Sequence, residues 1–410
     1  MNANHHSNIT AVPALGRRRF LQTGAAAAGA ISILPSATVR AFNANSKIRL
    51  GIIGCGGRGQ WIAKLFRENG SYEIAGAADF FADHAEALQL AQDRVFTGLK
   101  CGEKMIAKGG LDAVAVISPP FFHPSQTRAA VDAGLHVYLA KPMAVDVPGC
   151  QEIQAAGEAA RKKNLTLLID FQTRATDFFI EAMKRVHAGA LGDLCFGEAM
   201  YHGGRLGKQA EEGTKEAMIR NWVFHKSLSG DVMTEQFIHA IDVMNWAMNN
   251  AVPLRVDGSC GRKVRKDVGD CNDCFSLLFT YPNDVSITFT GRQYNGHGTR
   301  EGIINRMFGS KGTLETEYGG DVLIRTGDAN AYRGGKTPGI YKDGVVVNIR
   351  TFADSIKSGN ASNPTLESSV LSNLLTIFGR TAAYQKQPLA WADFMKSTDR
   401  MTPDLTGLPE

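Results

Sequence analysis

The spacing of apolar residues predicts a repeated strand–helix order in the first third of the chain. Apolar runs without polar alternation stand at residues 48–53, 73–78, 113–117 and 137–139. Stretches with apolar residues at helical spacing separate or follow them, at residues 61–66, 84–95, 102–110 and 124–133. Strands that are apolar on both faces and separated by helices are typical of a parallel sheet covered on both sides. Ligands of such sheets bind at the carboxyl ends of the strands.

The pattern changes after residue 171. A helical stretch at residues 178–188 is followed by runs in which apolar and polar residues alternate, at 194–201, 252–261, 274–281, 285–291 and 303–308. Further helical spacing occurs at residues 235–246, 351–358 and 367–382. Alternation of this kind is typical of strands with one covered face. With 410 residues, the chain is long enough for two domains with substantial cores.

The first 41 residues have the features of an export signal. Arg17, Arg18 and Arg19 precede Phe20-Leu21 and a short, alanine-rich apolar run, with small residues near Ala41. This order resembles the twin-arginine class of signal, and the run is too short for a convincing membrane span. The four arginines of this leader account for all but one of the chain's five net positive charges. A nearly neutral remainder offers no electrostatic reason to expect nucleic acid.

The seven cysteines do not predict a metal site. Their number is odd and their spacing irregular, so they do not form a disulfide framework. Cys271 and Cys274 form a single C-x-x-C, and zinc needs four ligands. Two ordinary thiols or one local disulfide are the alternatives there, and no metal is expected.

A glycine-rich turn follows the first predicted strand. Gly54, Gly56 and Gly59 give G-x-G-x-x-G between a strand and a helix, with Gly57 and Arg58 inside the motif. These glycines permit a tight turn, a close approach of backbone N–H groups to a pyrophosphate, and close helix packing. The next strand ends at Asp79, where an acid accepts hydrogen bonds from the adenosine ribose. The prediction is a dinucleotide site that prefers NAD over NADP, since Asp79 would repel a 2′-phosphate.

Two further positions are candidates for catalysis. Lys141 directly follows an apolar strand, at the edge where ligands bind. His239 has Glu235 four residues before it and Asp242 three residues after it, so a helix would place the carboxylates near the histidine. Such a histidine is either a proton acceptor or a structural residue hydrogen-bonded to Asp242.

Taken in order, these motifs resemble the glucose-fructose oxidoreductase / inositol dehydrogenase / MocA family. The resemblance rests on the glycine motif, Ser118-Pro119 with His123, Ala133-Gly134-Leu135-His136-Val137 and Lys141-Pro142. It continues through residues 189–193, the Gly230…His239…Asp242…Trp246 segment and residues 308–314. The chain departs from the family at Ala140, Glu235 and Phe237, where the family usually has glutamate, aspartate and glycine. Network contacts known for that glutamate are therefore not carried over.

The resemblance implies a fold and a division of the chain. It predicts an α/β protein: an N-terminal Rossmann dinucleotide-binding domain, then an α/β domain with a large, mostly antiparallel sheet. The predicted parts are a twin-arginine signal peptide, a Rossmann NAD(P)-binding domain, a substrate and oligomerisation domain, and C-terminal helices that pack back towards the first domain. Their limits are residues 1–41, 47–170, 171–350 and 351–410.

The resemblance also implies roles for individual residues. His239 would accept a proton, Lys141 would stabilise the substrate oxygen, and Glu235 would orient His239 or hold a neighbouring hydroxyl. Ser118, Pro119, His123, Lys141 and Arg174 join the glycine motif and Asp79 as expected cofactor contacts. Weaker candidates for the substrate are Asp242, His202, Arg220 and Trp222.

The predicted function is hydride transfer between a ring hydroxyl of a sugar, glycoside or cyclitol and NAD, with C3 of a pyranoside as the favoured position. An NAD-dependent glycosidase that oxidises the ring transiently is the alternative, and a cofactor-stabilised binding protein is a third interpretation. Export predicts a periplasmic or otherwise exported protein, handled by the twin-arginine machinery, whose NAD is bound before export. A homo-oligomer, dimer or tetramer, without a stable membrane anchor completes the expectation.

Overall fold

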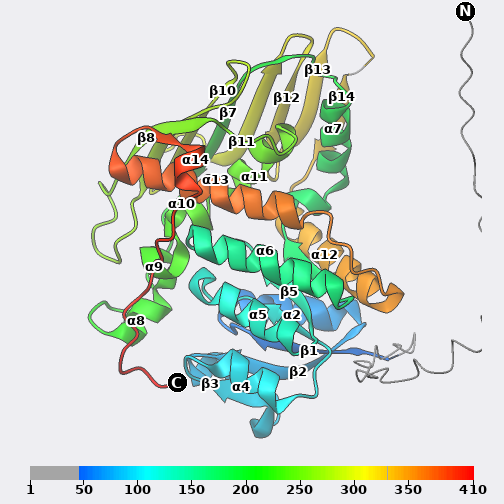
Figure 1. The fold of residues 1–410 in the computed structure, drawn as a ribbon, viewed down its shortest axis with the longest axis vertical. Coiled ribbons are helices and arrows are strands. Elements are labelled where there is room, and N and C mark those ends of the chain that lie inside the picture. Colours follow the sequence, from blue (N-terminus) through cyan, green and yellow to red (C-terminus); the bar gives the residue numbers. More distant parts are fainter. Residues whose placement is uncertain (1–45, 330) are drawn as a thin grey trace, which may run out of the picture. The chain divides into compact units, whose positions relative to one another are not determined.

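Two β-sheets organise the chain in the computed structural model, which describes residues 46–329 and 331–410 (Figure 1). The predicted signal peptide, residues 1–41, lies outside the described residues. Residues 46–410 form one compact unit, so the predicted division at residues 170 and 350 stays a prediction. None of the described helices combines the length and the apolar character needed to cross a membrane.

The first sheet is parallel throughout and has the strand order β3-β2-β1-β4-β5-β6. Its strands are β1 (Ile48–Ile53), β2 (Tyr72–Asp79), β3 (Val95–Thr97), β4 (Ala113–Val116), β5 (His136–Ala140) and β6 (Leu167–Asp170). Chain order reverses between β1 and β4. The carboxyl ends of these two strands therefore bound the crevice in which a doubly wound sheet binds its ligand.

Helices cover both faces of this sheet, as the apolar strands require. One side carries α4 (Cys101–Lys108), α5 (His123–Asp132) and α6 (Val147–Lys162), and the other carries α2 (Gly57–Asn69) and α12 (Ile340–Ser358). The helix predicted over residues 84–95 is wrong. The short α3 (Ala82–Glu86) ends early, a 3₁₀ turn η1 (Gln92–Arg94) follows, and β3 pairs with β2. The apolar residues of this stretch fall at helical spacing, and an edge strand of only three residues is too short to show an alternation of its own.

The second sheet has nine strands in the order β14-β13-β12-β11-β7-β10-β9-β8-β15. They are β7 (Leu194–Gly203), β8 (Arg255–Gly261), β9 (Cys274–Thr280), β10 (Ser286–Gln293), β11 (Gly302–Gly309), β12 (Gly312–Glu317), β13 (Asp321–Thr326), β14 (Tyr332–Lys336) and β15 (Leu389–Ala390). Only β7 and β10 pair in parallel; the other neighbours are antiparallel. The expected large, mostly antiparallel sheet is confirmed.

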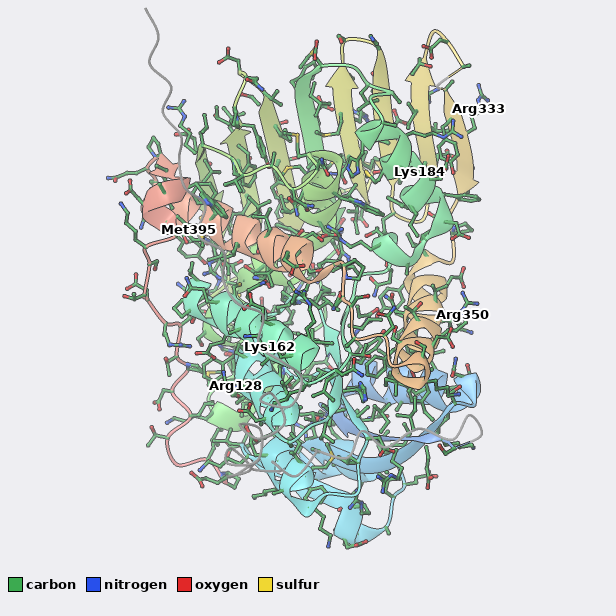
Figure 2. All side chains as sticks on the ribbon, turned by 45° about the vertical axis from the view of Figure 1, so that its right-hand side comes forward. Arg128, Lys162, Lys184, Arg333, Arg350 and Met395 are labelled. Carbon is green, nitrogen blue, oxygen red and sulfur yellow. The ribbon has the colours of Figure 1, made fainter. Side chains whose placement is uncertain are left out.

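Helices from the second half lie between the two sheets (Figure 1). α13 (Leu366–Gln385) packs on the inner face of the second sheet beside α11 (Ile238–Ala247), and it also contacts α6 of the first part. The remaining elements are α7 (Asp177–His187), α8 (Lys215–Arg220), α9 (Lys226–Ser229), α10 (Asp231–Glu235), α14 (Trp391–Phe394), η2 (Pro120–Phe122), η3 (Thr173–Ala175) and η4 (Trp222–Phe224). α8, η4, α10 and α11 contribute residues to the cavities at the ligand-binding edge of the first sheet. Figure 2 shows that side chains fill the space between the two sheets.

Candidate functional site

The glycine-rich turn is shaped so that no side chain fits its first and last glycines. Gly54 has φ +90°, and a Cβ there would lie 2.5 Å from the backbone nitrogen of Ser118. A Cβ on Gly59 would lie 1.9 Å from the carbonyl oxygen of Gly54. Gly57, in the first turn of α2, has open space around its Cβ position, and no side chain caps the helix. The free N–H groups of this turn fit a pyrophosphate.

Asp79, the last residue of β2, faces this turn and is held by three donors. Its Oδ2 accepts a hydrogen bond from the backbone N–H of Cys55 at 2.6 Å. Its Oδ1 accepts from the N–H of Phe81 at 2.9 Å and lies 3.2 Å from Nδ1 of His84. The hydrogen bond to Asp79 raises the pKa of His84. The carboxylate thus stands where an NAD-binding acid contacts the adenosine ribose.

A cavity of about 420 Å³ runs along the turn. Its lining includes the turn glycines, Arg58, Asp79, Ser118 and Pro119, as predicted for cofactor contacts. It also includes residues that the sequence did not point to: Phe81, His84, Leu99, Gln126, Gln209 and Ile219. The backbone of the glycine turn, the Asp79 carboxylate and the cavity each match what a bound dinucleotide needs. These residues therefore fit a dinucleotide.

A second cavity of about 330 Å³ adjoins the first. Arg58, Ile117, Ser118 and Trp222 line both cavities. The other lining residues are Pro120, Ala140, Lys141, Gln172, Tyr201, Leu206, Glu235, Gln236, His239 and Tyr341. The three predicted catalytic side chains therefore come together beside the dinucleotide cavity.

Lys141 is fixed at the end of β5 by contacts from distant segments. Its Nζ donates to Oε1 of Glu235 at 2.8 Å and also to the carbonyl oxygen of Glu235. Only 11% of the lysine side chain and 13% of the glutamate side chain are exposed, so solvent screens this pair weakly. Asn373 of α13 holds the chain just after the lysine, since its Oδ1 accepts from the N–H of Met143 at 2.7 Å.

His239, in the first turn of α11, lines the second cavity with one ring nitrogen out of contact. Its Nδ1 is buried and has no hydrogen-bond partner among the described residues, and its ring lies 5.5 Å from that of Tyr318. Burial lowers the pKa of His239 well below its usual range, and the charges of Lys141 and Arg58 lower it further. The imidazole is therefore neutral near pH 7 and able to accept a proton.

The helix predicted over residues 235–246 is interrupted, and this changes the role of Glu235. α10 ends at Glu235 and α11 begins at Ile238. Phe237 lies between them, fully buried, with its ring 5.1 Å from Tyr201 and 5.5 Å from Phe289. Within the described residues no hydrogen bond joins Glu235 to His239. The expectation that Glu235 orients His239 is replaced by its pairing with Lys141.

Arg174 and Asp242 lie outside both cavities. Arg174 donates three hydrogen bonds of 2.8–3.0 Å to the Asp242 carboxylate and stacks over Trp246, and Ser372 donates to the same carboxylate at 2.7 Å. Asp242 has no exposed side-chain surface. Neither the cofactor role expected of Arg174 nor the substrate role expected of Asp242 fits this geometry. The structural alternative for His239, a bond to Asp242, is also absent.

His123 and His202 also lie outside both cavities. His123 is 1% exposed, with Nδ1 at 2.8 Å from the carbonyl oxygen of Pro142 and Nε2 at 2.7 Å from that of Ser118. Burial lowers the pKa of His123 to about 4. It ties together the two loops that carry Lys141 and Ser118, instead of contacting the cofactor. His202 of β7 lies 3.2 Å from Oγ1 of Thr290 on the neighbouring strand, so its predicted substrate contact is not supported.

Arg58 and Trp222 lie where the two cavities meet, and Arg220 lies on the wall of the dinucleotide cavity. Arg58 donates to Asp170 at 2.6 Å and to the Tyr341 hydroxyl at 2.7 Å, at the junction of the two cavities. Trp222 lines that junction as well, whereas Arg220 lines only the dinucleotide cavity and not the second one. Arg220 is thus not placed to contact a substrate in the second cavity. No local signal points to Tyr341, which comes from α12.

All seven cysteines are free thiols, Cys271 and Cys274 among them. Nowhere in residues 46–329 and 331–410 do three His, Cys, Asp or Glu side chains gather closely enough to hold a metal ion.

Comparisons with known proteins agree with this geometry. Residues 48–171 match the profile of an oxidoreductase family with an NAD-binding Rossmann fold, and residues 179–315 match a GFO/IDH/MocA C-terminal domain. The chain is 24% identical to the myo-inositol dehydrogenase Hyg17 of Streptomyces leeuwenhoekii over 69% of this chain and 81% of that protein. Three further curated relatives are matched over only 54–56% of their own length.

Solved structures show the same fold at low identity. GenD2 from gentamicin A biosynthesis, in complex with NAD, superposes with a TM-score of 0.67 at 15% identity over 86% of this chain and 98% of that one. Levoglucosan dehydrogenase, in complex with NADH and levoglucosan, superposes with a TM-score of 0.64 at 18% identity over 84% and 99%.

Proposed function

The chain belongs to the GFO/IDH/MocA oxidoreductase family, whose first domain binds NAD, and on this premise we propose that it oxidises a hydroxyl group on a sugar or cyclitol ring. The observation that carries the proposal is the meeting of Lys141 and His239 in the cavity that adjoins the dinucleotide cavity. When bound, the nicotinamide supplies the acceptor for the hydride. The protein supplies the groups that act on the hydroxyl oxygen and its proton.

In the proposed mechanism, His239 accepts the hydroxyl proton. Its neutral state follows from burial and from the nearby charges of Lys141 and Arg58. Lys141 donates a hydrogen bond to the same oxygen and stabilises the negative charge that develops there as the proton leaves. Glu235 acts as a positioning residue, because its carboxylate and its carbonyl oxygen both accept from the lysine ammonium.

The charges around the second cavity favour a neutral substrate. Its two cationic side chains are each paired with a carboxylate, Lys141 with Glu235 and Arg58 with Asp170. No charge is left over for a phosphate or a sugar acid among these pairs. Tyr201, Trp222 and Tyr341 add aromatic faces and hydroxyl groups, which suit the apolar and polar sides of a sugar ring.

We further propose NAD over NADP, because the Asp79 carboxylate at the ribose would repel a 2′-phosphate.

Export by the twin-arginine route, loading of NAD before export and a homo-oligomeric state remain proposals, motivated by the Arg17–Arg19 leader and the family resemblance. Full-length protein expressed with and without a twin-arginine translocase tests the first two. A protein found only in the cytoplasm, or one exported without nucleotide, would contradict them.

A substrate panel tests the proposed reaction. Purified protein is mixed with NAD and with inositols, free aldoses, pyranosides, a uronic acid and a sugar phosphate, and nicotinamide absorbance is followed. Neutral rings should reduce NAD, and NMR of the product gives the carbon oxidised, with C3 the favoured position for pyranosides. Lys141→Met should lower kcat/KM by about 10²–10⁴-fold with NADH binding retained.

The outcomes separate the competing functions. Unchanged turnover by Lys141→Met would reject the role given to the lysine. Glycoside cleavage without net reduction of NAD would favour the glycosidase alternative, which uses the same base and cofactor. Sugar binding with neither reaction would leave a binding protein.

A further inference from the structure

The end of the dinucleotide cavity that receives the adenosine is bounded by both parts of the protein. The first part carries the first sheet, and the second part carries the second sheet. Asp79 marks this end, since the acid at the end of β2 contacts the adenosine ribose. Phe81 and His84 follow it on the first part and line the cavity. Ile219 and Arg220 of α8 line the same cavity from the second part.

Arg220 is held against this end by three residues. Its guanidinium carbon lies 3.9 Å from the centre of the Phe81 ring. Its Nη2 donates to both Asp83 oxygens, at 2.9 and 3.1 Å, and its Nη1 lies 3.1 Å from Nε2 of His84. About a third of the side chain, 32%, stays exposed. The guanidinium is thus oriented on the cavity wall, and the side chain keeps surface that a ligand can contact.

The donors and acceptors form a chain that ends at Asp79. Arginine has no acceptor, so in the neutral imidazole Nε2 of His84 accepts from Nη1 of Arg220. The other ring nitrogen, Nδ1, then carries the proton and donates to Oδ1 of Asp79 at 3.2 Å. A side chain of the second part therefore orients the acid that binds the ribose.

The last residues of the chain tie α8 to the first part. We call residues 399–410 the C-terminal tail; in Figure 1 it runs past α8 and ends beside β3 and α4. Lys215 of α8 donates to Oδ1 of Asp404 and to the carbonyl oxygen of Thr406, each at 2.8 Å. Further along, the N–H of Leu99 donates to the carbonyl oxygen of Pro409 at 2.9 Å. Since Leu99 also lines the cavity, the tail is bound to both of its sides.

We propose that Arg220 is a cofactor-binding residue that encloses the adenosine of NAD together with Phe81, and that the C-terminal tail holds this clamp closed and so slows release of the dinucleotide. The inference rests on the proposed function, because it assumes that the cavity holds NAD. It adds a contact from the second part to those of the glycine turn. An adenosine in contact with both parts of the protein would be released slowly, as the proposed loading of NAD before export requires.

The test compares NADH with reduced nicotinamide mononucleotide, which lacks the adenosine. Release of each from the full-length protein is followed by stopped-flow fluorescence, and affinity by calorimetry. Arg220→Ala should speed NADH release about tenfold, because the exposed guanidinium surface and the orientation of Asp79 are lost together. Binding of the mononucleotide should not change. Lys215→Ala, which removes the contacts of α8 with Asp404 and Thr406 of the tail, should speed NADH release by a smaller factor.

Arg128→Ala is the matched control. Arg128 pairs with Asp132 on the exposed side of α5 (labelled in Figure 2), so its loss should leave both ligands unaffected. Unchanged NADH release in Arg220→Ala, or equal weakening of NADH and the mononucleotide, would overturn the clamp. Unchanged release in Lys215→Ala would overturn the part given to the tail. Failure of the unaltered protein to bind NADH at all would instead reject the proposed function.

Discussion

The protonation state of His239 follows from its immediate surroundings. Its Nδ1 is buried without a partner, and Lys141 and Arg58 add positive charge near the ring. Burial and these charges all disfavour the imidazolium, so the pKa of His239 lies well below that of a free histidine. The base should therefore stay unprotonated into the acid range.

The pH dependence of turnover tests this state. Since catalysis needs the neutral imidazole, kcat/KM should stay level as the pH falls and decline only well below pH ~6.5, the ordinary value for histidine. A pH–rate profile with the best substrate of the panel measures the decline. The His239→Asn variant should lose most of the activity, and the activity that remains should no longer show this decline at low pH. A decline centred at or above that pH in the unaltered protein would assign the proton to another group.

At the scale of elements, α11 is joined to η3 and α13 through one buried ion pair. Asp242 of α11 accepts from Arg174 of η3 and from Ser372 of α13, and neither charged side chain lines the dinucleotide cavity or the cavity that adjoins it. The pair thus holds the helix that begins with Ile238 and His239, without contact to cofactor or substrate.

Removing one partner should therefore affect stability more than binding. Asp242→Ala leaves the Arg174 guanidinium buried without its carboxylate, and it should lower the free energy of unfolding by about 3–5 kcal/mol. Urea denaturation measures the loss, and calorimetry should find the NADH affinity of the folded variant nearly unchanged. Asp132→Ala breaks an exposed pair on α5 and should leave stability almost unaltered. A stable Asp242→Ala variant that fails to bind NADH would restore Asp242 to the site.

Prediction from the sequence succeeded for some of these elements and failed for others. β1, β4 and β5 carry a strong apolar signal, and the glycine turn is recognised from its own residues. β3 has three residues and pairs by its backbone, so no pattern in its side chains marks it. The break between α10 and α11 depends on Phe237 packing against β7 and β10, which helical spacing does not reveal.

At the scale of the whole molecule, buried neutral histidines make stability depend on pH. Burial lowers the pKa of His136 to about 4, and that of His239 well below its usual range. Nδ1 of His136 accepts from the backbone N–H of Thr166 at 2.9 Å, a contact that protonation of this nitrogen would break. The folded protein therefore resists taking up these protons.

The unfolded chain takes them up near pH ~6.5, so stability should fall as the pH drops from there towards 4. Each such histidine contributes a slope of about 1.4 kcal/mol per pH unit. Urea denaturation over this pH range measures it. His136→Gln keeps an acceptor for the N–H of Thr166 and should lower the slope of stability against pH by about the contribution of one histidine. His297→Gln, on an exposed loop, should not change the slope. A slope that is the same in all three proteins would contradict this account.

The sequence by itself determined what depends on neighbours along the chain. The strand–turn–helix around Gly54 and Gly59, the acid at the end of β2, the lysine after β5 and the histidine of α11 are all local features. Only the tertiary structure decided which of them touch. Lys141 meets Glu235 across 94 residues, Arg58 meets Tyr341 across 283, and Arg220 reaches His84 across 136. Such pairs follow from how the two sheets and the helices between them pack, and no spacing in the sequence specifies that.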